Sequence, residues 1–506
     1  MIQKQICSAI LIINSYTFFS HSLRAADITV PSGGNLQAAI YAALPGDSIT
    51  LAAGAVFTGQ FFFPEKTGSG WITVRSSGYA NLPPFKRVSP AQTSSMAILQ
   101  PFGSNTPVTF GTRSHHWKLV GLEIRAAAGV YSFDLLRIGD GSQSSVSDLP
   151  HDISVERCYI HGDTLVGTKR GIALNGRTVT VRDSYISNIF SDVQETQGIL
   201  GWNGPGPFTI ENNRIEAAGL GIMFGAVTPA IPNLVPSDIN VSKNYFLKPL
   251  AWKNKTYVVK HHFELKNGRR VVLSGNVMEN TWHPTMRGTA IQFTVRTEAG
   301  TVPWAVVEDV KVVGNIIKNA GNGFTITGFD DSTGGGLCRR ILIQDNLLTG
   351  IDEANSDPAF WGRGGFLYLV FRPTDVWAIH NTVLTKGLTL VEFAIETGSG
   401  FRLENNVLQN NVLGIYGAGV GSGTAALNAY QSIWSVKGNL IQGGLAAENP
   451  VGNSFPTTLD DVRFINQGSG DYAISSASPY SRKATDGKDP GANMVLLKSL
   501  TSGVVR

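Results

Sequence analysis

One six-residue pattern recurs along the chain and constrains its fold more than any other feature. The pattern is apolar-x-x-Asn-x-apolar, and residues 210–215, 241–246 and 273–278 are typical copies. Cys158 and Ser184 take the Asn position in two earlier copies. The Asn itself occupies the fourth position at Asn213, Asn244, Asn276, Asn315, Asn346, Asn381, Asn406 and Asn439. Successive copies lie 25 to 39 residues apart, a period that is typical of stacked structural repeats.

Each repeat is strand-like, because apolar and often β-branched side chains alternate with polar ones. A second strand usually opens with Gly, as at residues 171–175, 221–225 and 323–327. No helical periodicity fills the intervals, so the strands cannot be joined by crossover helices. Parallel strands joined by turns pair with the coils above and below them. The pattern therefore predicts an all-β fold, a right-handed single-stranded parallel β-helix of about ten coils.

The recurring Asn has a structural explanation. Asn tolerates the left-handed backbone region, and its amide can hydrogen-bond to the same residue one coil away. A stack of such amides forms a ladder inside a turn. We expect these asparagines to hold the coils in register and not to take part in catalysis.

The two ends of the chain differ from the repeats. Residues 1–25 contain Lys4, an apolar stretch and a small-residue region, in the order typical of a signal peptide. The apolar stretch is shorter than the roughly 18 residues of a membrane-spanning helix, so we expect cleavage, no membrane insertion, and a secreted, periplasmic or cell-surface location. Residues 26–450 should form the β-helix, with a helical cap at 35–43. Residues 451–506 should form an irregular tail that packs on the last coils.

Charge and cysteine content narrow the possible partners. The formal net charge of +4 becomes +2 when Lys4 and Arg24 leave with the signal peptide. No cluster of basic residues interleaved with aromatic ones is present, so we expect no nucleic-acid partner. Cys158 and Cys338 lie six coils apart, which at about 4.8 Å per coil is roughly 29 Å and beyond disulfide reach. We expect two free thiols and a monomeric protein.

The repeat resembles the pectate-lyase-like superfamily of parallel β-helices, from Ile28 to about residue 445. That superfamily contains lyases, hydrolases, esterases, epimerases and non-enzymatic surface proteins, so the fold alone does not select a function. Of the polygalacturonase motifs, only the paired Asp330 and Asp331 have a counterpart, and His380 lacks the aspartate that precedes it in pectate lyases. The chain resembles more the chondroitinase-B and alginate-lyase branch. In that branch a Lys and an Arg on neighbouring coils flank a calcium site.

The second strand changes character in two consecutive repeats, residues 262–267 and 290–296. Because strand side chains alternate, the polar side chains of these repeats point outward on one face. They are Glu264, Lys266, Gln292, Thr294 and Arg296. The predicted register places Glu264 beside Gln292 and Lys266 beside Thr294, with Arg296 diagonal to Lys266 at roughly 7–8 Å.

This polar cluster suits β-elimination of a uronic-acid polymer, in which the sugar carboxylate must be neutralised while the proton next to it is removed. Arg296 could clamp the carboxylate, and Lys266 could act as the base, because a neighbouring cation favours its neutral form. His283 is a secondary base candidate. Glu264 either pairs with Lys266 or joins a calcium shell with Glu298 or Asn267, calcium being the cofactor that the resemblance implies.

The remaining site candidates would bind the substrate. Trp202 lies two coils before Lys266 and is placed to stack on a sugar ring, and Asn175, Gln292 and Thr294 complete the predicted substrate-binding set.

These residues are compatible with three alternative functions. The first is a polysaccharide lyase that cleaves an acidic glycan. The second is a non-catalytic glycan-binding surface protein, in which Glu264 and Lys266 are only a surface ion pair and Arg296 is solvated. The third is a glycoside hydrolase, which needs two carboxylates. The outward strand positions supply one, Glu264, unless Asp330 or Asp331 reaches it.

Overall fold

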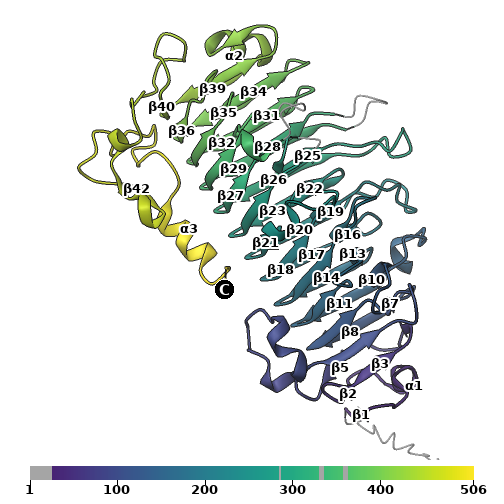
Figure 1. The fold of residues 1–506 in the computed structure, drawn as a ribbon. Helices are drawn as coiled ribbons and strands as arrows, with labels where there is room; N and C mark the ends of the chain where they lie inside the picture. Colours follow the sequence, from purple (N-terminus) through teal and green to yellow (C-terminus); the bar gives the residue numbers. More distant parts are fainter. Residues whose placement is uncertain (1–24, 284–286, 330–335, 357–362, 506) are drawn as a thin grey trace, which may run out of the picture.

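The computed structural model describes residues 25–283, 287–329, 336–356 and 363–505. The chain winds into a solenoid whose sides are three long sheets, here called A, B and C, of 14, 13 and 13 strands (Figure 1). All pairings in these sheets are parallel except that of β37 with β38. The predicted parallel β-helix is confirmed. The predicted signal peptide lies outside the described residues except for Ala25.

The strands of each sheet come from successive coils. Sheet A contains β1 (Asp27–Val30), β2 (Ser48–Leu51), β5 (Ile72–Ser76), β8 (His115–Val120), β11 (His151–Glu156), β14 (Arg177–Arg182), β17 (Phe208–Glu211), β20 (Ser237–Ser242), β23 (Gly268–Ser274), β26 (Val307–Val313), β29 (Cys338–Gln344), β32 (Thr374–Ile379), β35 (Phe401–Glu404) and β39 (Trp434–Lys437). Sheet B contains β3 (Val56–Thr58), β6 (Ala97–Gln100), β9 (Leu122–Arg125), β12 (Tyr159–His161), β15 (Tyr185–Ile189), β18 (Arg214–Ala217), β21 (Tyr245–Leu247), β24 (Val277–Thr281), β27 (Ile316–Ala320), β30 (Leu347–Asp352), β33 (Thr382–Lys386), β36 (Val407–Gln409) and β40 (Leu440–Gln442). Sheet C contains β4 (Phe61–Phe63), β7 (Val108–Phe110), β10 (Ser132–Ile138), β13 (Thr168–Leu174), β16 (Gln197–Gly201), β19 (Leu220–Phe224), β22 (Phe263–Leu265), β25 (Thr289–Thr294), β28 (Asn322–Thr327), β31 (Leu367–Val370), β34 (Val391–Ala394), β37 (Ile415–Gly417) and β38 (Gly421–Ser422).

The repeating Asn marks the corner between sheets A and B. In one coil, β20 ends at Ser242 and β21 begins at Tyr245, with Asn244 between them. The six-residue pattern is therefore the end of one strand, a turn and the start of the next, and each coil has three strands where the sequence indicated two. The coils before residue 150 lack the Asn, which is why the sequence indicated fewer coils than the sheets contain.

The predicted Asn ladder is confirmed. The main-chain N–H and the Nδ2 of Asn244 both donate to Oδ1 of Asn276, at 2.9 and 3.1 Å, and Asn276 binds Asn315 in the same way. All three side chains are fully buried. The left-handed residue is not the Asn but the one before it, such as Lys243 with φ 54°. That residue turns the chain and directs the amide into the corner.

The interior of the solenoid is one apolar core that runs along its length. Stacked aromatic residues contribute to it, and Phe263 and Phe293 on successive coils of sheet C are fully buried. Cys158 and Cys338 are free thiols in this interior, as expected, and burial raises the pKa of the Cys158 thiol to about 12. Both thiols are therefore packing residues.

Helices close both ends of the core. Helix α1 (Leu36–Ala42) covers the first coil with Leu36 and Ile40, and its N-cap Asn35 accepts a hydrogen bond from the N–H of Ala38. Helix α2 (Thr424–Tyr430) buries Ala426 and Leu427 at the opposite end. None of the helices in the described ranges is long and apolar enough to cross a membrane.

The C-terminal tail is more ordered and reaches farther than the sequence indicated. It contains the antiparallel pair β41 (Phe464–Asn466) and β42 (Asp471–Ile474) and the helix α3 (Met494–Thr501). Figure 1 shows α3 running back along the solenoid, away from its last coils. Val504 packs on Tyr245 and Val277, so the end of the tail covers the middle coils.

Candidate functional site

The outer face of sheet C carries one side chain per coil in a straight column. The register pairs Met223 with Glu264 and continues upward one coil at a time. Its polar members, which we call the polar column, are Glu264, Gln292, Thr325, Tyr368, Glu392 and Tyr416. The predicted pairing of Glu264 with Gln292 is present. Below Glu264 the column holds the apolar side chains of Met223, Leu200 and Ala173, and Arg137 lies one coil below these.

Lys266 and Arg296 lie at the edge of this face, where the strands β22 and β25 end. The main-chain N–H of Arg296 donates to the carbonyl oxygen of Lys266 at 3.0 Å. The two residues are thus main-chain partners on adjacent coils, where the sequence placed them on a diagonal. The side chain of Lys266 is half-buried and that of Arg296 is exposed.

Glu264 is a buried carboxyl group at the base of the polar column, with 2% of the residue exposed. Its Oε1 accepts a hydrogen bond from Nε2 of Gln292 at 3.1 Å, and no described residue donates to its Oε2. Burial raises the pKa of Glu264, although the positive charge of Lys266 works against this. The raised pKa favours the protonated form of the Glu264 carboxyl group.

A second carboxylate, which the sequence did not reveal, completes this cluster. Glu195 precedes β16, pairs through Oε2 with Lys260, and accepts a hydrogen bond at Oε1 from Nε2 of Gln197 at 3.1 Å. Burial alone would raise the pKa of Glu195, but Lys260 and Lys266 lower it overall. The negative charge of Glu195 in turn raises the pKa of Glu264, so the two carboxyl groups belong to one electrostatic site. Glu195 lies in a turn outside any repeating pattern, and no signal in the sequence marks it.

Of the predicted substrate-binding residues, Gln292 belongs to this cluster, but Asn175 does not. The side chain of Asn175 is fully buried, and its Oδ1 accepts hydrogen bonds from the main-chain N–H groups of Trp202 and Asn203, each at 3.0 Å. Asn175 therefore shapes a turn. Thr294 is buried and hydrogen-bonds to Thr327 at 3.4 Å.

Trp202 lies two coils below Lys266 and is half-buried. Its ring packs with Leu200 and Met223, and the guanidinium of Arg170 lies 5.4 Å from the ring centre. The ring is therefore packed against apolar residues of the face and partly exposed.

The predicted calcium ligands do not converge. Oδ1 of Asn267 accepts a hydrogen bond from the N–H of Val306 at 3.2 Å, so Asn267 holds a turn. Glu298 lies in the loop after Arg296 with a left-handed φ of 48°, and Glu264 turns toward Gln292. Within the described ranges, no group of three or more His, Cys, Asp or Glu could hold a metal ion. The arrangement of these residues does not fit a calcium site.

His283 lies apart from Lys266. It is buried in the turn after β24, where its main chain bridges to Ser356. His283 thus lies between the end of a sheet B strand and the start of a sheet C strand, whereas Lys266 and Arg296 follow the ends of sheet C strands. Asp330 and Asp331 lie outside the described residues.

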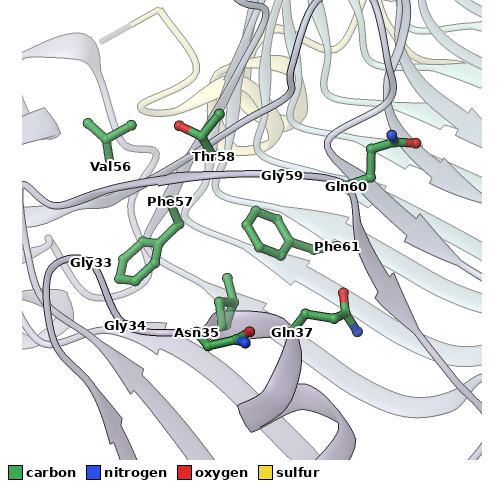
Figure 2. A pocket seen from close by; sticks show the side chains of 11 residues that line it. Gly33, Gly34, Asn35, Gln37, Val56, Phe57, Thr58, Gly59, Gln60 and Phe61 are labelled. Atoms are coloured by element: carbon green, nitrogen blue, oxygen red, sulfur yellow. The ribbon is translucent and has the colours of Figure 1, made fainter.

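A pocket at the N-terminal end of the solenoid is a poor alternative site. Figure 2 shows it between the start of α1 and the segment from Val56 to Phe61. Its lining contains no ionisable side chain. Its Gln37 is already engaged, because it donates to the carbonyl oxygen of Phe62 and accepts from the N–H of the same residue, both at 2.8 Å. This pocket offers no group for acid–base chemistry.

The sequence matches no protein-family model and no curated protein. Solved structures match in fold. The catalytic unit of the GH87 α-1,3-glucanase from Streptomyces thermodiastaticus aligns with a TM-score of 0.51 and 13% identity, over 86% of this chain and 70% of that chain. The PL6 family alginate lyase AlyGC aligns with a TM-score of 0.50 and 13% identity, over 94% of this chain and 58% of that chain. The tailspike of Escherichia coli bacteriophage HK620 aligns at 0.48 and 11% identity, over 85% of this chain and 72% of that chain.

At these identities the likeness concerns the fold alone. The alginate lyase and the glucanase differ in activity and both align with this fold. Together with the three parallel sheets and the Asn ladder, the comparisons identify the fold of this chain as a right-handed parallel β-helix.

Proposed function

We propose that this protein is a polysaccharide lyase that binds an acidic glycan on the outer face of sheet C and cleaves it by β-elimination. The observation that carries the proposal is the direct main-chain pairing of Lys266 with Arg296 on adjacent coils, beside the buried carboxyl group of Glu264. The PL6 neighbour is an alginate lyase, which makes a uronic-acid polymer the first substrate class to test.

The chemistry requires one cation to neutralise charge and one base to remove a proton. Arg296 would bind the uronate carboxylate through two parallel N–H donors, so that charge can spread onto the carboxylate as the neighbouring proton leaves. The side-chain nitrogen of Lys266 would accept that C5 proton. The electron pair then forms the C4–C5 double bond as the C4–O bond breaks, and the departing oxygen takes the proton back from Lys266.

A glycoside hydrolase is the second candidate, and one observation favours it. The pKa of Glu264 is raised and that of Glu195 is lowered, an arrangement that separates an acid from a base within one site. Glu264 would protonate the leaving oxygen, and ionised Glu195 would serve as the base or nucleophile.

The type of product separates the candidates. The protein would be incubated with alginate, pectate and glycosaminoglycans, with and without added calcium. A lyase releases unsaturated ends that absorb ultraviolet light, and we expect Lys266→Ala to lower this rate at least about 100-fold. The control Lys311→Ala changes an exposed lysine on sheet A and should leave the rate unchanged.

The contrary outcomes are equally distinct. Absorbing ends that Lys266→Ala still releases at the normal rate would rule out the proposed base. Reducing ends without absorbance, lost in both Glu195→Gln and Glu264→Gln, would establish the hydrolase. Retention on a glycan column without any turnover would indicate a binding protein.

A further inference from the structure

We propose that Arg287 and Arg363 form a second anion-binding subsite at the upper end of the polar column, and that it takes another carboxylate of the same acidic glycan. This inference rests on the proposed function in one respect, the acidic substrate. It assigns a binding role to residues that the cleavage chemistry does not use.

The two arginines converge on one carboxylate of the column. Nη1 of Arg287 lies 2.8 Å from Oε2 of Glu392, and Nε of Arg363 lies 3.3 Å from the same oxygen. The guanidinium of Arg287 lies over the ring of Tyr368, 3.6 Å from its centre. That of Arg363 lies 5.8 Å from the ring centre of Tyr416. In the upper polar column, two aromatic rings, those of Tyr368 and Tyr416, thus lie against two cations.

The main chain holds Arg287 in this position. Its carbonyl oxygen accepts hydrogen bonds from Nδ2 of Asn322 at 2.5 Å and from Oγ of Ser356 at 2.6 Å. Because Asn322 and Ser356 belong to higher coils, these hydrogen bonds tie Arg287 to the coils above β25, where its side chain meets Glu392. The carbonyl oxygen of Arg363 likewise accepts from the N–H of Leu388 at 2.7 Å. Both backbones are fixed before any ligand arrives, which lowers the entropy cost of binding.

Charge and exposure suit an anionic ligand. Arg287 and Arg363 are two cations that share the single carboxylate of Glu392. The side chains of Arg287 and Arg363 are 19% and 10% exposed, so they reach solvent while most of each is shielded from it. A guanidinium stacked on an aromatic ring still presents N–H donors in its plane, in the geometry that a carboxylate accepts bidentately.

The spacing indicates the length of the ligand. Four coil steps separate Glu264 from Glu392, which at about 4.8 Å per step is about 19 Å. The cations Lys266 and Arg296 lie at the lower end of this span and the two arginines at its upper end. Between them, Gln292 and Thr325 offer neutral hydrogen-bonding groups that suit sugar hydroxyls. An acidic oligosaccharide that lies along the column would span both cationic regions, and a disaccharide would not.

Binding of short and long oligomers tests the subsite. Titration calorimetry would use hexamers and dimers of mannuronate and of galacturonate. We expect Arg287→Gln and Arg363→Gln each to weaken hexamer binding at least tenfold and dimer binding less than twofold. Glu392→Gln removes the internal competitor and should strengthen hexamer binding severalfold, a gain that a misfolded variant would not give.

The control is Arg340→Gln, because Arg340 belongs to a similar cluster with Glu308 and Asp309 on sheet A and should not affect binding. Unchanged hexamer affinity in both arginine variants, or a wild-type protein that binds neither hexamer, would overturn the subsite. Failure of the proposed function looks different: the hexamer binds and its affinity depends on Arg287, but no unsaturated product forms.

Discussion

At the scale of single residues, a pair of buried histidines makes the stability of this protein sensitive to acid. His261 and His262 precede β22, and both are buried. Nδ1 of His261 lies 2.8 Å from the carbonyl oxygen of Thr289, so the ring donates to it. Burial lowers the pKa of His261 to about 4, and burial also lowers that of His262, with the positive charge of Lys248 adding to the effect. Both rings are therefore neutral in the folded protein at pH 7.

The sign of the pH effect follows from these shifts. The unfolded chain protonates His261 near pH 6.5 and the folded protein only near pH 4, so acidification between these values favours unfolding. We expect His261 to remove about 3 kcal/mol from the free energy of unfolding over this window. Denaturant unfolding at pH 7 and pH 4.5 measures the loss, and it should be smaller in His261→Asn. Parallel pH curves for the two proteins would contradict the prediction.

Lys248 is a second residue whose burial has consequences. Its Nζ donates to the carbonyl oxygens of Ala217, Ala218 and Gly219 at 2.9, 2.8 and 3.0 Å, and its side chain is fully buried. Burial lowers the pKa of Lys248 to about 7. The amine thus serves the three carbonyls at the end of β18 and in the turn before β19, of which those of Ala218 and Gly219 also accept from the main-chain N–H of Lys260, both at 3.2 Å.

Removal of that amine should be costly. We expect Lys248→Met to lower the free energy of unfolding by about 2 kcal/mol, because the buried carbonyl group of Ala217 would lose the amine as its donor and those of Ala218 and Gly219 would keep only the N–H of Lys260. The matched variant Lys311→Met changes an exposed lysine and should cost less than about 0.5 kcal/mol. Denaturant unfolding of the two variants at pH 7 compares them directly, and equal midpoints would refute the structural role of Lys248.

At the scale of elements, the Asn ladder makes each coil depend on its neighbour. Asn315 accepts two hydrogen bonds from Asn276 and donates Nδ2 to Leu273 and to Asn346, all in a fully buried corner. Ser184 shows what a shorter side chain can do at this position, because its Oγ accepts from the N–H of Cys158 at 3.0 Å. A serine can therefore keep part of the ladder.

This comparison predicts a graded effect. Asn315→Ala should lower the free energy of unfolding by about 3 kcal/mol, since several buried groups lose their partners at once. Asn315→Ser should cost less, because its hydroxyl can still accept from the N–H of Asn276. Thermal unfolding followed by circular dichroism gives the order of the two variants, and an Ala variant as stable as the Ser variant would speak against the ladder as a source of stability.

Residues in the strands could be predicted from the sequence, and residues in the turns could not. Alternation within strands and the periodic Asn predicted the solenoid and the outward set that includes Glu264 and Gln292, because both depend on a regular repeat. Glu195, Arg287 and Arg363 lie in the turns between strands, whose lengths differ from coil to coil. The path of such a turn depends on packing across coils, as where hydrogen bonds tie Arg287 to the coils above β25, and no periodicity encodes it.

At the scale of the whole molecule, hydrogen bonds of one side chain, that of Arg87, connect an N-terminal loop with the C-terminal tail. Nη1 of Arg87 donates to the carbonyl oxygen of Val504 at 2.7 Å, while its Nε donates to the carbonyl oxygen of Asn212 and its Nη2 to that of Lys243, both at 3.2 Å. Arg87 is 417 residues from Val504 in sequence. The clamp keeps the end of the tail on the middle coils, where Val504 covers Tyr245 and Val277.

Loss of this clamp should free the tail and leave the solenoid intact, because the tail adds no strand to the three sheets. We expect Arg87→Ala to raise the rate of trypsin cleavage at Lys498, in α3, at least about tenfold, since local opening exposes the backbone to the protease. Arg113→Ala is the control, because the side chain of Arg113 forms exposed ion pairs with Glu65 and Asp148 on the early coils, far from the tail in sequence. Cleavage at Lys498 at the wild-type rate in Arg87→Ala would mean that apolar packing of α3 alone holds the tail, with the clamp contributing nothing measurable to its closure.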